Sequence, residues 1–211
     1  MTEVTWYFDF ISPFSYLQLN RFRDLPRHLT VKMKPVVFSA LLDHWGSKGP
    51  AEIPTKRRFV YRFFKWQADR RGLPFTMPPQ HPFNPIPPLR LAVASEANEA
   101  AIQEIFRFIY VEGRNVDGDN AISELGERLG IPDAARRISD PDIKIALKTN
   151  TDAAIADGVF GVPTFAVDRE LFWGDDATDM FIDYLSDRAF FGDPELLRLS
   201  NMPMGLVRLN R

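Results

Sequence analysis

The chain has 211 residues, of which 45% are hydrophobic, and its formal net charge is −2. This length suffices for one sizeable core or for a domain with an insertion. Because the net charge is small, the protein has no overall electrostatic field that would attract nucleic acid. No apolar run approaches the length of a membrane span, which is about 18 residues. There is no cysteine, which excludes disulfides and thiolate metal sites. Because the N-terminus lacks a basic region and Asp9 interrupts its apolar run, we expect no signal peptide and a cytoplasmic protein.

The first stretch of the chain predicts a strand that turns directly into a helix. Residues 4–10 are rich in aromatic and β-branched side chains, as in a buried strand. The helix is expected from Pro13 to about Leu25, because Ser12 is a favoured cap and proline suits the first helical position. Ser12 would then place a hydroxyl beside unpaired N–H groups, where a helix stabilises an anion.

A second strand is predicted at residues 29–38, which completes a βαβ unit with a right-handed crossover. The segment 55–71 predicts a helix with an aromatic core face, formed by Phe59, Phe63 and Trp66, opposite a solvated basic face. The alternative for the basic face is that one or two of its cations bind carboxylates of a small ligand.

Residues 73–88 contain seven prolines and predict an extended loop, because proline removes backbone donors and forbids helix. The loop holds Asn84 and His81. The three histidines of the chain lack metal-ligand spacing, and His81 is notable only because its loop could border a pocket.

After a helical block, two short strands are predicted at 164–168 and 170–173, joined by a turn at Asp168-Arg169. A helix is expected from about residue 176 to about residue 188. The tail from Asp193 onward shows no clean period, and packing on a second subunit is one option for it.

Three short motifs follow one another along the chain: SPFS at 12–15, GVPTF at 161–165 and FWGDD at 172–176. The first stands where thioredoxin-like oxidoreductases carry Cys-x-x-Cys, with serine at both sulfur positions. Together the motifs resemble those of the 2-hydroxychromene-2-carboxylate isomerases and kappa-class glutathione transferases, relatives of the DsbA-type oxidoreductases. The resemblance implies an α/β, thioredoxin-like fold with an all-helical insertion domain at 51–157, so that residues 1–50 and 158–211 form the thioredoxin-like domain.

The resemblance also implies a glutathione site around Ser12, the expected catalytic residue. Ser12 would donate a hydrogen bond to the sulfur of glutathione, which helix N-termini help to hold as the thiolate. Val162 would pair with the cysteinyl backbone of glutathione, like an added strand, beside a cis peptide bond to Pro163. The γ-glutamyl end would be bound by the turn that contains Trp173, Gly174, Asp175 and Asp176.

Further expected contacts come from two loops. Lys56 matches the lysine of the family's Gly-Asn … Pro-x-Lys element, whereas Ser47 replaces its asparagine, and both are expected to contact glutathione or substrate. Asn84 fits a family asparagine near the substrate, with a loop-structuring role as the alternative. Ser15, at the position of the resolving cysteine, is expected to pack or cap. Asp43 stands where the isomerases often carry lysine.

The activity implied is glutathione-dependent interconversion of 2-hydroxychromene-2-carboxylate and trans-o-hydroxybenzylidenepyruvate, in aromatic hydrocarbon degradation, through reversible thiolate addition. Glutathione would be the cofactor, a small aromatic carboxylate the substrate, and a homodimer the assembly, with no nucleic acid or membrane partner. The departures at Asp43 and Ser47 leave two alternatives. One is a kappa-like glutathione transferase that acts on another electrophile, and the other is a non-catalytic glutathione-binding module.

Overall fold

The computed structural model of the chain describes residues 3–206. Its strands are β1 (Glu3–Phe8), β2 (Thr30–Pro35), β3 (Thr164–Val167) and β4 (Glu170–Trp173). Its α-helices are α1 (Pro13–Leu19), α2 (Phe38–Trp45), α3 (Pro54–Arg70), α4 (Ile86–Ala94), α5 (Glu99–Phe106), α6 (Asp119–Leu129), α7 (Ala134–Arg137), α8 (Pro141–Ala156), α9 (Thr178–Ser186) and α10 (Pro194–Ser200). A π-helical segment, Arg107–Val111, continues α5, and short 3₁₀ turns occur at Phe22–Asp24, Pro50–Glu52, Asp175–Ala177 and Phe190–Gly192.

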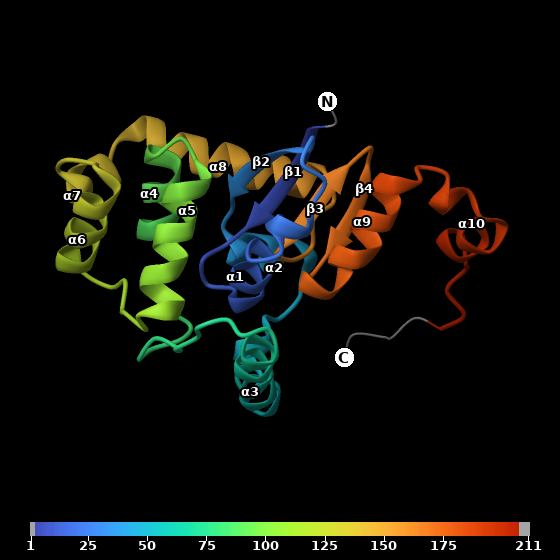
Figure 1. Cartoon of the computed structure of the whole chain (residues 1–211), viewed down its shortest axis with the longest axis horizontal. Coiled ribbons are helices and arrows are strands. Elements are labelled where there is room, and N and C mark those ends of the chain that lie inside the picture. The colour runs from blue at the N-terminus through green and yellow to red at the C-terminus, as the bar shows by residue number, and fades with distance from the viewer. Residues whose placement is uncertain (1–2, 207–211) are drawn as a thin grey trace.

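The four strands form one mixed sheet in the order β2-β1-β3-β4 (Figure 1). Strand β1 pairs parallel with β2 and antiparallel with β3, so that Trp6 lies opposite Phe165. β3 and β4 form the expected hairpin, and its turn residues Asp168 and Arg169 have φ values of 53° and 71°, which suit a tight two-residue turn. The predicted sequence of βαβ, helical block and ββα is confirmed, and with it the thioredoxin-like fold.

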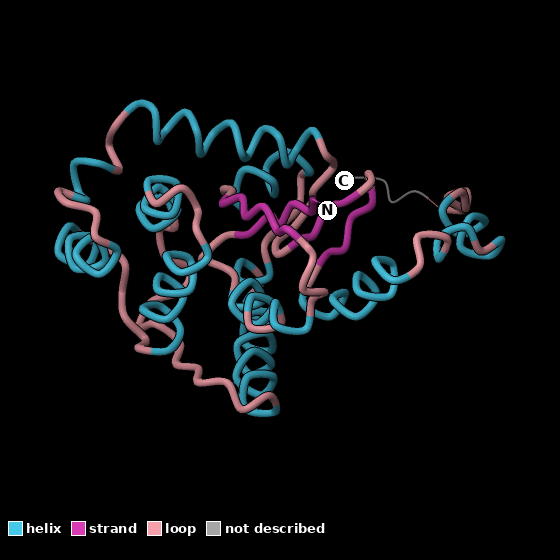
Figure 2. Tube along the Cα trace, turned by 45° about the horizontal axis from the view of Figure 1, so that its top comes forward, coloured by secondary structure: helices cyan, strands magenta, loops and turns pink. Residues whose placement is uncertain are grey.

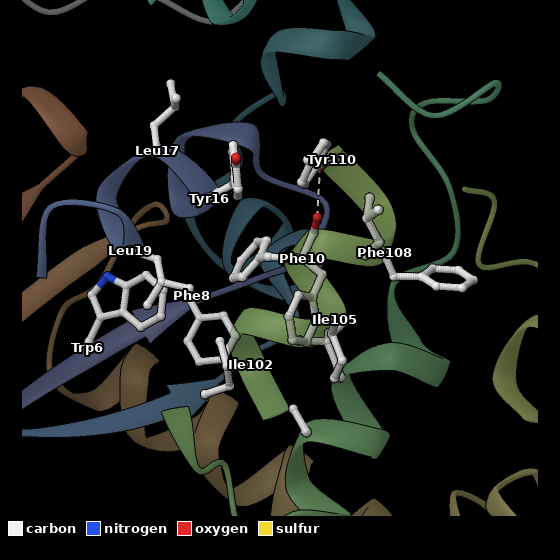
Figure 3. Packing of buried hydrophobic residues seen from close by; sticks show 14 of the residues in the cluster. Trp6, Phe8, Phe10, Tyr16, Leu17, Leu19, Ile102, Ile105, Phe108 and Tyr110 are labelled. Carbon is white, nitrogen blue, oxygen red and sulfur yellow. Dashed lines mark hydrogen bonds between the residues drawn. The ribbon is translucent and has the colours of Figure 1, made fainter. Parts of the chain in front are cut away.

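Alternate residues of β1 enter two different cores. Trp6 and Phe8 stack at 4.4 Å on one face, in a cluster that continues through Phe10 to Phe106 of α5. Figure 3 shows this packing and the hydrogen bond of 2.8 Å that the Tyr110 hydroxyl donates to the Phe10 carbonyl. The helical block therefore shares its core with the sheet. The division into residues 1–50, 51–157 and 158–211 stays a prediction, and residues 207–211 of its last part lie outside the described residues.

The opposite face of the sheet is covered by other helices. Tyr7 of β1 joins a smaller cluster with residues of α2 and α8, among them Leu41 and Ala154. Figure 2 shows the long helix α8 running across this face, with further helices on the other side of the strands. Within residues 3–206, none of the helices is both long and apolar enough to cross a membrane.

Two predicted elements need correction, and the unassigned tail contains a helix. Helix α1 ends at Leu19 rather than near Leu25, because the Asn20 side chain donates to the Tyr16 carbonyl at 2.8 Å and a 3₁₀ turn follows. The predicted strand at 29–38 is shorter, since the backbone leaves the sheet after Pro35. The tail, which showed no period, contains α10, capped by the carboxylate of Asp193.

The predicted aromatic core face of α3 is wrong. Phe59 and Trp66 are 64% and 51% exposed, whereas the buried residues of α3 are Val60, Phe64 and Ala68. The two stripes begin one residue apart and both have helical spacing. Phe14 of α1 lies nearer to the ring of Phe64 (4.7 Å between centroids) than to that of Phe63 (6.2 Å), so docking on α1 favours the buried stripe.

Candidate active site

Ser12 stands at the junction of β1 and α1, with Pro13 in the first turn of the helix as predicted. The residue is 8% exposed and has an extended backbone (φ −98°, ψ 109°), as a cap position requires. Its hydroxyl, however, does not cap the helix, and instead donates to the Val162 carbonyl at 3.4 Å. A bond of this length is weak, so the Ser12 hydroxyl can be redirected to a ligand at small cost.

The segment before β3 lies directly beside Ser12. The Val162–Pro163 peptide bond is cis, as predicted. The Val162 carbonyl faces the Ser12 hydroxyl, and no hydrogen-bond partner for the Val162 N–H is found among residues 3–206. This stretch therefore offers a backbone edge to which an extended peptide can add.

A buried carboxylate holds the loop between β1 and Ser12. Asp9 is fully buried, and its two oxygens accept the N–H groups of Ile11 (3.0 Å) and Phe38 (2.9 Å). The Ser12 N–H donates in turn to the Asp9 carbonyl at 3.1 Å. Burial raises the pKa of Asp9 to about 7, although the N–H donors act in the opposite direction.

The proline-rich loop reaches the same junction from the helical block. His81 Nε2 lies 2.7 Å from the Ile11 carbonyl, and its Nδ1 lies 2.6 Å from the Tyr61 hydroxyl of α3. Burial lowers the pKa of His81, which favours the neutral imidazole. His81 thus borders the residue that precedes Ser12, a contact that the sequence indicated only through the position of its loop.

The turn after β4 is tied to both earlier elements. The Gly174 N–H donates to the Pro163 carbonyl at 2.8 Å, and the Gly174 carbonyl accepts from the Gln18 amide of α1, also at 2.8 Å. Gly174 has φ 94°, and a Cβ there would lie 2.4 Å from an oxygen of Asp176, so glycine is required. The turn therefore lies close to Pro163 and α1, next to Ser12.

The two aspartates of this turn differ in their surroundings. Asp175 is 1% exposed, and both of its oxygens pair with the Arg71 guanidinium, at 2.8 and 2.5 Å. Arg71 follows α3, so this pair joins the helical block to the turn. Asp176 is exposed. Only Asp176 keeps a carboxylate that an incoming cation can reach without displacing an internal one.

The other predicted site residues lie on exposed segments. Ser47 follows α2 and its N–H donates to the Leu42 carbonyl, while Lys56 is in the first turn of α3. The Asn84 side chain accepts the Ile86 N–H at 3.1 Å, as in a loop-structuring role. A hydrogen bond thus connects Ser12 with the cis-proline segment, and a second one connects that segment with the turn at residues 174–176. Within residues 3–206, no hydrogen bond joins Ser47, Lys56 or Asn84 to that group.

Sequence reasoning missed several residues that support the site. Asp9 could have been recognised, because a carboxylate at the end of an apolar strand needs buried hydrogen-bond donors. Gln18 gave a weaker signal, as a polar residue in a helix that is otherwise buried. Arg71 gave none, because it was one of several cations assigned to a solvated face.

These features define a thioredoxin-fold protein in which serine stands at the active-site cysteine position. A family profile for the DSBA-like thioredoxin domain matches residues 3–186, and the chain therefore belongs to that family.

The chain is similar to two groups of curated enzymes. It is 26% identical over 209 residues to glutathione S-transferase kappa 2 of Caenorhabditis elegans, covering 87% of this chain and 92% of that protein. It is 29% identical over 180 residues to a 2-hydroxychromene-2-carboxylate isomerase of Pseudomonas putida, covering 82% and 89%. A solved structure of 2-hydroxychromene-2-carboxylate isomerase aligns with TM-score 0.78 and 26% identity, over 92% of this chain and 98% of that one. These similarities support a glutathione-related isomerase or transferase of the family.

Proposed function

We propose that the protein is a glutathione-dependent isomerase that interconverts 2-hydroxychromene-2-carboxylate and trans-o-hydroxybenzylidenepyruvate. The observation that carries the proposal is the Ser12 hydroxyl, which is free of its own helix and stands beside the cis-proline segment. In a family chain without cysteine, this hydroxyl can orient an external thiol but cannot replace it as a redox centre. A cytoplasmic location fits this chemistry, because the glutathione pool is kept reduced there.

The residues of the site fit glutathione in three places. The backbone of Val162 would pair with the cysteinyl residue, since its N–H has no partner within residues 3–206 and its carbonyl only a weak one. Asp176 would hold the γ-glutamyl ammonium group, while Asp175 keeps the turn in place through Arg71. The remaining contacts proposed for glutathione are Pro163, Trp173, Gly174, Ser47 and Lys56.

The chemistry of the chain is limited to binding and electrostatics. Glutathione, when bound, supplies a thiolate that would add reversibly to the conjugated substrate. It would leave unchanged once the ring has opened and a bond of the opened substrate has rotated. Ser12 would transfer its hydrogen bond from the Val162 carbonyl to the sulfur and so favour the ionised form. Asn84 would contact the aromatic carboxylate at the edge of the site.

A kappa-like transferase is the second candidate, because the chain is 26% identical to a kappa-class enzyme and carries Asp43 and Ser47 at positions where the isomerases differ. In that reaction the same site would bind glutathione, but the sulfur would stay attached to the electrophile. Only product analysis separates the two reactions, since function depends on the site and not on the fold.

Titration calorimetry with reduced glutathione tests the shared part of both candidates. Wild-type protein is expected to bind glutathione saturably, and the complex is expected to show the ultraviolet absorbance of the thiolate. In Ser12→Ala the thiolate fraction is expected to fall about tenfold, which corresponds to a rise of one unit in the pKa of the bound thiol. Ser15→Ala is the matched control, because the Ser15 hydroxyl is buried and has no hydrogen-bond partner within residues 3–206. It should behave as wild type. Absence of binding by the wild type would reject both candidates.

Turnover then separates the candidates. Conversion of the chromene carboxylate with recovery of glutathione supports the isomerase, and consumption of glutathione by an electrophile supports the transferase. Binding of glutathione with neither reaction would leave a non-catalytic module.

We propose a homodimer as the assembly. Phe59, Phe63 and Trp66 stack along α3 with centroid separations of 5.7 Å, and the outer two are more than half exposed. Exposed aromatic surface of this kind is typical of interaction sites. Light scattering should give the mass of two chains, and Phe59→Glu should shift the mass toward one chain. A wild-type monomer at high concentration would reject the assembly.

A further inference from the structure

The peptide bond that leads into Ser12 is held at both of its polar groups. Its N–H donates to the Asp9 carbonyl at 3.1 Å. Its carbonyl, that of Ile11, lies 2.7 Å from His81 Nε2. The first bond comes from the same loop, but the second comes from a residue seventy positions away, in the proline-rich segment of the helical block. The orientation of this peptide plane therefore depends on His81 as well as on the bond to Asp9.

The contacts of His81 determine its tautomer. A carbonyl oxygen only accepts hydrogen bonds, so Nε2 must carry the hydrogen that faces Ile11. In the neutral ring Nδ1 is then an acceptor, and the Tyr61 hydroxyl lies 2.6 Å from it. Tyr61 comes from the buried side of α3, and its ring packs edge-on against the imidazole at 5.1 Å. The Tyr61 hydroxyl also lies 2.7 Å from the His81 carbonyl, so Tyr61 holds the position of His81, whereas the Ile11 carbonyl sets its tautomer.

We infer that His81 is a positioning residue for Ser12: its Nε2–H orients the Ile11–Ser12 peptide plane and thereby the Ser12 hydroxyl, with Tyr61 holding the imidazole in place. This inference rests on the proposed function, because it names what keeps that hydroxyl aimed at the sulfur. No other residue replaces the contact of His81 with Ile11, because the Ile11 carbonyl has no other donor within residues 3–206.

The expected consequence is a loss of chemistry with little change in fold. The Ser12 hydroxyl itself is held only by a weak bond to Val162, so a tilt of the preceding peptide changes its direction. Misplacement of a catalytic group by about 1 Å can cost about a hundredfold in rate. Loss of this one part-buried hydrogen bond should leave the fold intact, because the buried carboxylate of Asp9 still holds the loop through Ile11 and Phe38.

Three variants separate positioning from simple packing. His81→Leu removes the Nε2–H donor but keeps an apolar side chain. His81→Gln keeps an amide N–H at a comparable reach and should restore the bond to Ile11. Tyr61→Phe removes both contacts of the Tyr61 hydroxyl with His81 and so loosens the imidazole, and it serves as the second variant where His81→Leu folds poorly.

The pKa of the glutathione thiol in the complex, titrated by its ultraviolet absorbance, is the principal measurement. His81→Leu is expected to raise this pKa by about one unit, a tenfold loss of thiolate at neutral pH. His81→Gln should stay within about threefold of wild type in thiolate fraction, and Tyr61→Phe should fall between the two. A His81→Leu complex with the wild-type thiol pKa, or a Gln variant as defective as Leu, would overturn the inference.

A second measurement needs no ligand and keeps the two proposals separate. Amide hydrogen exchange at Ser12 reports how firmly its peptide is held. Exchange is expected to be faster in His81→Leu than in wild type and unchanged in Ser12→Ala. If exchange responds in this way while wild type binds no glutathione, the positioning role stands and the proposed function fails. Equal exchange in His81→Leu and wild type would overturn the positioning role, whatever the glutathione result.

Discussion

Helix α3 has two sides that contribute differently to the molecule. On the inner side Val60, Phe64 and Ala68 are buried, and the polar residues Tyr61 and Arg71 at the same side reach His81 and Asp175. On the outer side, the aromatic stack that includes Phe59 is exposed, and the Arg70 guanidinium lies over its Trp66 ring.

The difference teaches that one helix of the insertion supports the site at two separate points. The contact with His81 is a set of neutral hydrogen bonds beside Ser12, and the contact with Asp175 is a charge pair beside the Gly174 turn. The outer side touches neither point. Changes on the inner side should therefore alter stability or chemistry, whereas changes on the outer side should alter association alone.

The largest effect is expected from Arg71→Leu. Asp175 has no exposed side-chain surface, so removal of Arg71 leaves a buried carboxylate without its counter-charge. Breaking one partner of such a pair costs about 3–5 kcal/mol, and urea denaturation should show this loss in the free energy of unfolding.

The double variant Arg71→Leu with Asp175→Leu is the control. It removes both charges and should recover most of the lost free energy, because apolar replacements of a buried pair are often neutral. A single variant that unfolds within about 1 kcal/mol of wild type would show that the pair contributes little to the inner side.

A second prediction compares two phenylalanines of the same helix. Phe64 is 4% exposed and Phe59 is 64% exposed. Phe64→Ala should cost about 3–5 kcal/mol in the free energy of unfolding, since it opens a cavity. Phe59→Ala should stay within about 0.5 kcal/mol, as for most surface changes. Both are measured by urea denaturation of dilute protein, and equal losses would contradict the distinction between the two sides.

The pattern of the sequence predicted the elements better than their faces. The β3–β4 hairpin and the start of α1 follow from local signals: a turn at Asp168-Arg169, and Ser12 followed by Pro13. The face of α3 did not follow, because the stripes beginning at Phe59 and Val60 both repeat at helical spacing. The docking on α1, where Phe14 lies nearer to Phe64 than to Phe63, favours one stripe over the other.

The site was predicted in part for a related reason. The motifs around Ser12 and Val162 were expected to lie together, and a hydrogen bond joins them. The supporting residues Arg71 and His81 could not be assigned, because each acts on a partner far along the chain, 104 and 70 positions away. Arg71 is one of many cations, and His81 is the one histidine of a proline-rich loop. Their neighbours in the sequence do not indicate such a distant partner.

The smallest effect concerns the dependence of stability on pH, and it tests the neutral contact of the inner side. Burial lowers the pKa of His81 below its ordinary value of 6.5, so the folded state takes up this proton later than the unfolded state on acidification. The contribution of His81 to stability is complete above pH 6.5, where the ring is neutral in both states. As the pH falls from there through the lowered folded pKa, only the unfolded state binds the proton, and the free energy of unfolding declines by at most about 1.4 kcal/mol per pH unit.

His81→Gln should lack this decline, because glutamine does not titrate. The difference in unfolding free energy between wild type and the variant is measured by urea denaturation between about pH 5 and pH 7.5, so that carboxylate titrations common to both cancel. We expect the difference to be constant above pH 6.5 and to move in favour of His81→Gln below it. A difference that is flat over the whole range would mean that the imidazole is no more buried than in the unfolded chain, and the neutral contact with Ile11 and Tyr61 would then have no measurable effect on folding.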